Sequence, residues 1–317
     1  MRKALIVGIN YYRGKNDLNG CVNDAYSIKT VLERNADGTL NFDVNLMTAV
    51  DEDTTITKSM LKDNIENLFD GDSEIALFYY SGHGYIESSG GYLVTSECQR
   101  GDEGLDLNQL ITIANNSKAK NKIIILDSCH SGELGNIAYN DSLSIISEGT
   151  TILTACSKEQ YAIESKGTGI FTNLLVNALY GAASNLIGDV TPGSVYAHVD
   201  QSLGAWEQRP IFKTNVKEFV SLRKNVPSIS VEDLRKITEL FNKPSEVFQL
   251  DPSYEPDSEC FIKENGKKFE ILQKYNRVNL VVPEGEKHMY YAAMNSKGCK
   301  LTSLGVHYWN LVTKNRI

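Results

Sequence analysis

The fold of this chain is decided by two short stretches, Tyr79-Tyr80-Ser81-Gly82-His83-Gly84 and Asp127-Ser128-Cys129-His130-Ser131-Gly132. Each follows an apolar segment, the first at residues 74–80 and the second at residues 122–126. A run of apolar, β-branched or aromatic residues that ends in Gly or Ser predicts a buried strand followed by a loop. Because sites in open α/β sheets form at the carboxyl ends of the strands, we expect His83 and Cys129 to meet there.

A cysteine and a histidine in such a position can act as a nucleophile and its base. The thiolate is the reactive form of cysteine, and a free thiol with a pKa of roughly 8.5 is mostly protonated at neutral pH. His83 can accept that proton, and its flanking glycines leave room for a substrate chain. The amides of Gly84 and Cys129 are candidates for an oxyanion hole, in which one donor contributes about 3 to 4 kcal/mol. The alternative is a buried structural thiol and an ordinary loop histidine, which the joint pattern disfavours.

These two motifs resemble the His and Cys motifs of caspase-like cysteine peptidases of clan CD, family C14, in particular its metacaspase and bacterial orthocaspase branch. Further matches follow in the family's order at Lys3–Tyr12, Leu18–Ala25, Thr154–Cys156 and Gly169–Thr172. The resemblance covers residues 3 to about 224. It implies the caspase-hemoglobinase fold, which is an α/β fold with a mostly parallel six-stranded sheet flanked by helices. It also implies that Cys129 attacks a peptide carbonyl and that His83 protonates the leaving amine.

The resemblance further implies a pocket for the side chain that precedes the scissile bond. The residues that match it are Cys21, Asp24, Ser81 and Asp127. Two carboxylates in this pocket would select Arg or Lys, since a guanidinium can be bound by two parallel hydrogen bonds. The alternative is that Asp24 caps a helix starting near Ala25 and that Asp127 orders the cysteine loop.

The pattern along the first 225 residues predicts alternating strands and helices, which is typical of a mostly parallel sheet covered on both faces. The predicted strands are residues 3–9, 42–47, 74–80, 122–126, 150–155 and 217–222, and the predicted helices are residues 21–34, 57–69, 105–115, 171–183 and 194–204. Residues 130–148 are the longest segment without a core pattern. Such a long loop inside a domain is usually functional or mobile.

A second domain is predicted after the linker Lys224-Asn225-Val226-Pro227-Ser228, so that residues 1–225 form the peptidase domain and residues 226–317 a small accessory α+β domain. Ser230 is a candidate cap for a helix that runs through Phe241. Short strands are predicted at residues 269–272, 277–282, 289–294 and 306–312, with turns at Asn265-Gly266, Pro283-Glu284-Gly285 and Lys297-Gly298. The aromatic side chains of Tyr290, Tyr291, Tyr308 and Trp309 would line a ligand pocket or fill the core.

The charge differs between the two predicted domains. Residues 1–225 contain 19 Lys and Arg against 28 Asp and Glu, whereas residues 226–317 contain 13 against 12. An acidic body disfavours nucleic acid as a partner and favours basic ligands, although a solvated acidic face is the commoner explanation of such a charge. No apolar run is long enough to span a membrane, so no membrane partner is expected. Protein or peptide substrates are the expected partners.

The cysteines and acidic residues indicate no resident metal. The six cysteines are scattered without a Cys-x-x-Cys pair, which argues against a zinc site and a disulfide scaffold and fits a reducing cytoplasm. Calcium activates many metacaspases, and an acidic group follows the His loop at Glu97, Asp102, Glu103 and Asp106. This spacing does not clearly match the family's calcium site, and an exposed acidic loop is the alternative. We therefore expect no cofactor, with calcium left open.

The positions of the basic residues bear on activation. No Lys or Arg occurs between Lys122 and Lys158, so an enzyme specific for basic residues could not cut itself within residues 130–148. Lys158, Lys166 and the linker at Arg223 and Lys224 remain possible cleavage sites. The accessory domain then becomes the candidate switch, and it would respond to a partner protein or a small signalling nucleotide. Caspase-like peptidases of bacteria resemble effectors of antiviral and cell-suicide systems, in which such a signal turns the enzyme on. The alternatives are a silent scaffold of the same fold and a thiol hydrolase of small amides.

Overall fold

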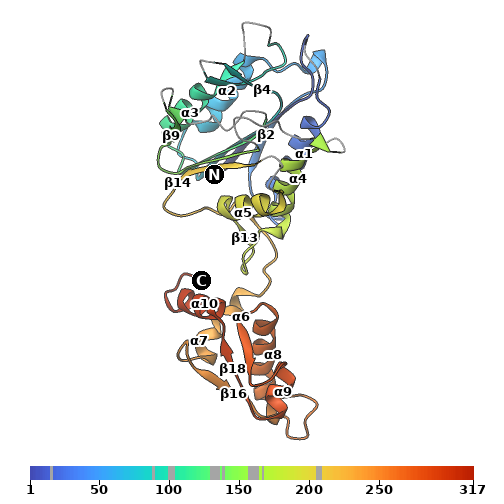
Figure 1. Cartoon of the computed structure of the whole chain (residues 1–317), viewed down its shortest axis with the longest axis vertical. Helices are drawn as coiled ribbons and strands as arrows, with labels where there is room; N and C mark the ends of the chain where they lie inside the picture. The colour runs from blue at the N-terminus through green and yellow to red at the C-terminus, as the bar shows by residue number, and fades with distance from the viewer. Residues whose placement is uncertain are drawn as a thin grey trace. The chain divides into compact units, whose positions relative to one another are not determined.

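Six strands form the central sheet of the N-terminal part of the chain, in the spatial order β14-β10-β7-β3-β1-β2 (Figure 1). They are β1 (Arg2–Ile9), β2 (Asp43–Ala49), β3 (Ile75–Ser81), β7 (Asn121–Asp127), β10 (Thr150–Thr154) and β14 (Ile211–Asn215). All neighbouring pairs are parallel except β10 and β14, which are antiparallel. The predicted α/β fold with a mostly parallel six-stranded sheet is therefore confirmed.

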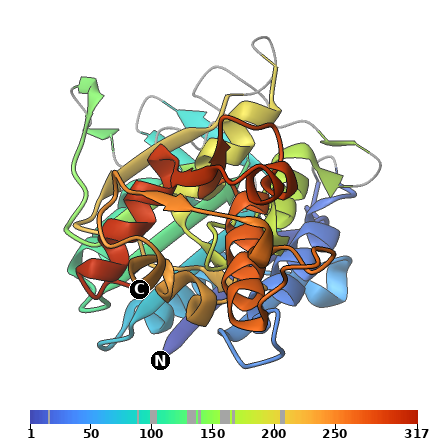
Figure 2. The same ribbon diagram turned by 90° about the horizontal axis from the view of Figure 1, so that it is seen from below.

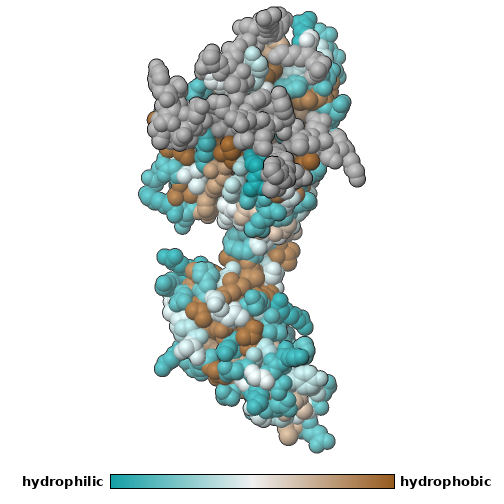
Figure 3. All heavy atoms as spheres, viewed as in Figure 1, coloured by the Kyte–Doolittle hydropathy of each residue, from teal (hydrophilic) through white to brown (hydrophobic). Residues whose placement is uncertain are grey.

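The computed structural model describes residues 1–14, 17–87, 90–98, 104–128, 136–137, 140–155, 164–165, 168–204 and 209–317. The chain divides into two compact units. The first comprises Met1–Ser184 with Asp189–Asn225, and the second comprises Asn185–Gly188 with Val226–Ile317. Hydrophilic and hydrophobic residues are interspersed on the face of each unit that Figure 3 shows, and each unit has a core of its own.

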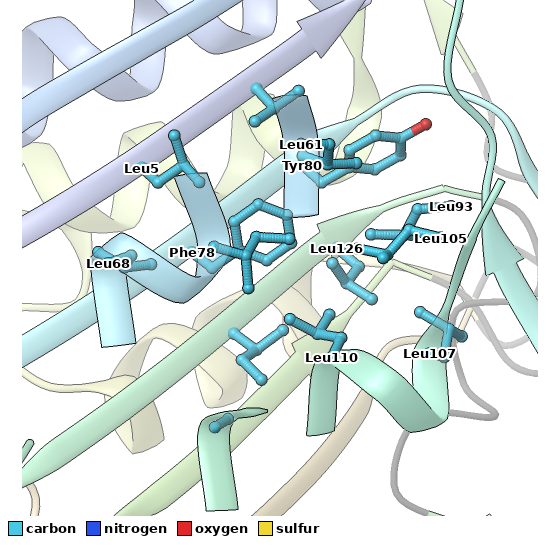
Figure 4. Close-up of a cluster of buried hydrophobic side chains, with 14 of the residues drawn as sticks. Leu5, Leu61, Leu68, Phe78, Tyr80, Leu93, Leu105, Leu107, Leu110 and Leu126 are labelled. Carbon is cyan, nitrogen blue, oxygen red and sulfur yellow. The ribbon is translucent and has the colours of Figure 1, made fainter. Parts of the chain in front are cut away.

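Helices cover both faces of the sheet (Figure 1). One face packs against α2 (Lys58–Phe69) and α3 (Leu107–Asn116), and the other packs against α1 (Cys21–Glu33), α4 (Ile170–Asn177) and α5 (Pro192–Ser202). β3 is buried along its whole length, and its successive side chains alternate between the two cores. Figure 4 shows the first core, in which Phe78 and Tyr80 of β3 meet Leu61 of α2 and Leu110 of α3.

Side-chain caps fix where several helices begin, which is why these predicted helices are confirmed to within a few residues. Thr57 accepts a hydrogen bond from the Met60 amide at the start of α2, and Asp106 accepts one from the Asn108 amide at the start of α3. The predicted helix 171–183 corresponds to α4 followed by a π-helical turn at Ala178–Ala182.

The prediction of a sixth strand at residues 217–222 is wrong, because the sixth strand is β14. Phe212 of β14 pairs with Leu153 of β10 and packs against the second core. Phe219 is instead 41% exposed, and its ring lies beside that of Phe212. The segment 217–222 contains apolar residues, but its only buried apolar side chain is Leu222. A prediction from apolar content alone therefore placed the edge strand at the wrong segment.

A small antiparallel sheet follows the His segment. It consists of β4 (Gly84–Glu87), β5 (Gly90–Leu93) and β6 (Leu105–Asp106), in that order. The cysteine segment leads into the short pair β8 (Asn136–Ile137) and β9 (Asn140–Ser144). Two further short pairs join β11 (Glu164–Ser165) to β12 (Thr168–Gly169) and β13 (Asp189–Val190) to β15 (Arg223–Lys224).

The second unit is an α+β arrangement around a three-stranded antiparallel sheet in the order β16-β18-β17. Its strands are β16 (Val247–Gln249), β17 (Val281–Glu284) and β18 (Gly298–Leu301), and its helices are α6 (Val231–Arg235), α7 (Ile237–Leu240), α8 (Lys263–Arg277), α9 (Met289–Met294) and α10 (Ser303–Thr313). Ser230 caps α6 through the Asp233 amide, as predicted. The predicted single helix through Phe241 is divided into α6 and α7.

Three of the four predicted strands in this unit are wrong. Residues 269–272, 289–294 and 306–312 lie in α8, α9 and α10, and the predicted turn at Asn265-Gly266 lies inside α8, the long orange helix of Figure 2. The fourth, predicted at residues 277–282, begins at Val281 instead. The buried residues of α8 are Phe269, Leu272 and Tyr275, whose spacing of three is that of a helix face.

The four aromatic residues that we considered as pocket or core divide between two environments. Tyr308 is buried in the core of the second unit, and the indole of Trp309 donates a hydrogen bond to the Phe241 carbonyl. Tyr290 and Tyr291 are instead 43% and 50% exposed. Tyr308 and Trp309 therefore fill the core, and Tyr290 and Tyr291 do not. No helix in the described ranges is long and apolar enough to cross a membrane.

Candidate active site

The His and Cys segments leave the sheet from adjacent strands at the same level. Ser81, the last residue of β3, pairs with Asp127, the last residue of β7. The Gly82 amide donates a hydrogen bond to the Asp127 carbonyl (3.3 Å) across this end of the sheet. His83 follows Ser81 by two residues, as Cys129 follows Asp127. Cys129 lies outside the described residues, so the geometry of the pair is given from the His83 side alone.

The backbone of His83 is held by buried phenols. Its amide donates to the Tyr12 hydroxyl (2.7 Å), and its carbonyl accepts from the Val94 amide (3.0 Å) and the Tyr80 hydroxyl (2.9 Å). The rings of His83 and Tyr12 lie with their centroids 4.6 Å apart. The first residue of β4, Gly84, is paired with Leu93. The sequence motifs place Tyr12 in a segment that resembles the family and indicate no role for its hydroxyl.

Gly82 is required where the chain passes these phenols. A Cβ atom on Gly82 would lie 2.5 Å from the Tyr12 hydroxyl and 2.6 Å from the Tyr80 hydroxyl, closer than real Cβ atoms approach. Burial raises the pKa of both Tyr12 and Tyr80 far above the usual value for tyrosine, so both hydroxyls remain protonated. The His loop therefore rests on two neutral hydroxyls that a larger residue at position 82 would displace.

Two carboxylates, those of Asp24 and Asp127, are buried at this end of the sheet, at 2% and 6% exposure. Ser81 donates its hydroxyl to Oδ2 of Asp24 (3.1 Å), and the Gly169 amide points at both oxygens of Asp24 (3.1 and 3.2 Å). Thr172 donates its hydroxyl to Oδ2 of Asp127 (2.7 Å). These contacts bring together elements that are far apart in the chain, because α1, β3 and β7 each contribute one group and the start of α4 contributes two.

The absence of a side chain at Gly169 allows the two carboxylates to approach. A Cβ atom there would lie 2.3 Å from Oδ2 of Asp127 and 3.1 Å from Oδ2 of Asp24. The two carboxylate oxygens are therefore separated by no more than the sum of these distances. Placing two buried carboxylates this close is costly unless hydrogen bonds or a cation compensate their charge.

The Tyr79 hydroxyl lies next to this pair, 2.6 Å from Oγ1 of Thr172. Burial raises the pKa of Tyr79 well above its usual value, and the charges of Asp24 and Asp127 raise it further. Cys21, the remaining residue expected in the pocket, is the buried first residue of α1. Its thiolate form would raise the Tyr79 pKa in the same way, which places Cys21 within electrostatic range of Tyr79.

Asp24 does not cap α1. The N-cap position of this helix is Gly20, and the Val22 amide in its first turn donates to Oδ1 of Asn10 (3.1 Å). Asp24 lies one turn further on and directs its carboxylate to Ser81 and Gly169. Of the two alternatives for Asp24, the structure therefore excludes the capping one.

The acidic residues after the His loop are engaged in capping where they are described. Oε1 of Glu97 accepts from the Lys58 amide (2.8 Å) at the start of α2, and Asp106 caps α3. Asp102 and Glu103 lie outside the described residues. Within the part of the chain that the structure describes, no group of three or more His, Cys, Asp or Glu side chains is arranged to hold a metal ion. His130, Cys156, Lys158 and Lys166 also lie outside that part.

Comparison with known proteins finds metacaspases among the relatives of this chain. Metacaspase-9 of Arabidopsis thaliana is 32% identical over 149 residues, which cover 42% of this chain and 44% of the relative. Metacaspase-1 of Debaryomyces hansenii is 28% identical over 211 residues, which cover 60% of this chain and 44% of the relative. The matches thus span less than half the length of these curated relatives.

A crystal structure of protein GSU0716 from Geobacter sulfurreducens shares the fold, with a TM-score of 0.52 at 18% identity over 72% of this chain and 98% of that one. The caspase domain family matches residues 1–238, which is well over half of the chain. The chain therefore belongs to the caspase domain family.

Proposed function

We propose that this protein is a cysteine endopeptidase that cleaves polypeptides after Arg or Lys, with Cys129 as the nucleophile and His83 as its acid and base. One observation carries the specificity, namely that the buried carboxylates of Asp24 and Asp127 lie where the His and Cys segments leave the sheet. A buried acidic pair favours a cationic side chain because the cation compensates two negative charges held out of water.

The chemistry follows from the expected roles. The Cys129 thiolate adds to the scissile carbonyl, and the amides of Gly84 and Cys129 stabilise the negative oxygen that forms. The bond to nitrogen breaks as the His83 imidazolium gives its proton to the leaving amine, which leaves a thioester on Cys129. A water molecule, deprotonated by His83, then attacks the thioester, releases the new carboxylate and regenerates the thiol.

The pocket would discriminate by charge and by shape. A guanidinium offers a planar array of donors that can reach one oxygen of each carboxylate, whereas an ammonium acts as a compact point charge. An aspartate side chain would bring a third negative charge beside Asp24 and Asp127 and would be rejected. We therefore expect cleavage after Arg to exceed cleavage after Lys, and no cleavage after Asp.

The test is hydrolysis of fluorogenic peptides that differ only in having Arg, Lys or Asp before the bond, with purified protein and with Cys129→Ala. Each reaction is run with calcium and with a chelator. The proposal expects cleavage after Arg and Lys that is abolished in the Cys129→Ala variant. Cleavage after Asp, or equal activity in Cys129→Ala, would contradict it. Silence in every reaction would point to a latent enzyme that awaits a ligand at its second unit or to a scaffold.

The proposal extends to how the enzyme is activated. Residues 123–157 contain no Lys or Arg, so the enzyme would activate without cutting itself there. The second unit would then hold the switch, responding to a partner protein or a small signalling ligand in a bacterial defence or cell-death pathway. Cys98, Cys260 and Cys299 are free thiols, which suits a reducing compartment such as the cytoplasm. Mass spectrometry of the activated protein tests this point, and a cut within residues 130–148 would contradict it.

A further inference from the structure

The start of α4 holds both members of the acidic pair. Gly169, the N-cap residue of α4, donates its amide to Asp24, and Thr172, in the first turn, donates its hydroxyl to Asp127. Thr172 is 1% exposed and Asp127 is separated from it by 45 residues in the chain. One short segment therefore contacts two carboxylates that belong to other elements, α1 and β7.

The direction of the hydrogen bonds can be worked out from the groups present. An ionised carboxylate only accepts hydrogen bonds, so the Thr172 hydroxyl must donate its single proton to Asp127. The Thr172 oxygen is then the acceptor in its 2.6 Å contact with Tyr79, and the Tyr79 hydroxyl is the donor. Tyr79, which stays protonated, thus orients Thr172, and Thr172 orients Asp127.

We infer that Thr172 is a specificity-determining positioning residue: its hydroxyl, oriented by Tyr79, fixes the Asp127 carboxylate in the direction that receives a basic side chain. The inference rests on the proposed function, since it assigns these groups to the recognition of Arg and Lys. Thr172 does not touch the reacting atoms in this account. Its loss should therefore weaken binding of the basic side chain and leave the reactivity of Cys129 intact.

Three substitutions separate this role from a merely structural one. Thr172→Val keeps the shape and removes the hydroxyl, Thr172→Ser keeps the hydroxyl, and Tyr79→Phe removes only the group that orients it. The matched control is Thr151→Val in β10, because Thr151 is 2% exposed and its hydroxyl is hydrogen-bonded to the Thr214 hydroxyl (3.0 Å). This control loses a buried threonine hydroxyl away from the acidic pair.

The measurements are kcat and KM for the Arg peptide, together with the rate at which iodoacetamide, a neutral reagent, alkylates Cys129. In Thr172→Val we expect KM to rise about tenfold, as for loss of a hydrogen bond to a charged group, with kcat and the alkylation rate within about twofold of wild type. Thr172→Ser and Thr151→Val should keep KM within about twofold of wild type. Tyr79→Phe should fall between them, at about threefold.

The double variant Tyr79→Phe with Thr172→Val tests whether Tyr79 acts on Asp127 through Thr172. If Tyr79 acts only through Thr172, the double variant has the KM of Thr172→Val alone. An unchanged KM in Thr172→Val, on a wild-type enzyme that cleaves after Arg, would overturn the inference and leave the proposed function standing. A parallel fall of kcat and of the alkylation rate would also overturn it, since Thr172 would then serve the fold. A wild-type protein that cleaves after Asp instead of Arg would refute the proposed function and this inference with it.

Discussion

The His loop and the acidic pair lie at the same end of the sheet but are held in different ways. His83 is fixed through its main chain, whose amide and carbonyl bond to Tyr12, Tyr80 and Val94. The carboxylates of Asp24 and Asp127 are fixed through their side chains, by contacts that include two hydroxyls and one amide. The position of the His loop is thus set by backbone hydrogen bonds, whereas the position of the acidic pair is set by hydrogen bonds to its side chains.

This difference predicts two kinds of mutational effect. A change under the His loop moves the backbone that carries the imidazole, so it should alter the chemical step for every substrate alike. A change around the acidic pair alters the direction or number of charges, so it should alter KM and the preference among substrates. The variants below test that separation, from the largest expected effect to the smallest.

Removal of the imidazole should have the largest effect. In His83→Ala we expect kcat for the Arg peptide to fall about a thousandfold, because a general acid and base is lost, with little change in KM. Steady-state kinetics measure both quantities. The control is His198→Ala in α5, which should retain wild-type kcat. A His83→Ala variant with more than a tenth of wild-type kcat would remove His83 from the mechanism.

Neutralising one member of the acidic pair should come next. In Asp127→Asn, which keeps the shape of the side chain, we expect kcat/KM for Arg and Lys peptides to fall about a hundredfold, mainly through KM. Asp24→Asn should behave similarly, and Asp53→Asn, which removes an exposed carboxylate, should not. Titration of rate against substrate concentration separates the two constants. A loss confined to kcat would place these carboxylates with the catalytic groups and break the comparison.

Loss of the hydroxyl under the His loop should have a smaller effect. In Tyr12→Phe the His83 amide loses its acceptor, and we expect kcat to fall about tenfold, equally for Arg and Lys peptides, with KM unchanged. Tyr26→Phe is the control, since Tyr26 is 51% exposed on α1. The ratio of the rates for the two peptides is the measurement that matters. A changed Arg to Lys preference in Tyr12→Phe would show that the two regions are not separate.

The sequence predicted the sheet well where strands are buried on both faces. β3 and β7 read as continuous apolar runs, and their predicted bounds differ from the observed ones by one residue at each end. The edge strand β14 was missed because its residues are only partly buried, and the more apolar segment after it was taken instead. In the second unit, short apolar runs fit either a strand or a helix, and the helical spacing of Phe269, Leu272 and Tyr275 went unrecognised.

The candidate site could be predicted only in part. Motif resemblance pointed to His83, Asp24, Ser81 and Asp127, and the structure brings the last three into one hydrogen-bonded group through α4. The roles of Gly169 and Thr172 could not be predicted, because they depend on contacts across 145 and 45 residues that no local pattern encodes. The close approach at Gly169 is likewise visible only in three dimensions.

The most direct test of the account is covalent labelling of the wild-type protein with peptidyl acyloxymethyl ketones that carry either Arg or Asp next to the reactive group. Intact mass and peptide mapping then show how many groups are attached and where. The account predicts one adduct on Cys129 with the Arg reagent, none with the Asp reagent, and none with either in Cys129→Ala. Labelling by the Asp reagent, or labelling by the Arg reagent at another cysteine such as the exposed Cys260, would contradict it.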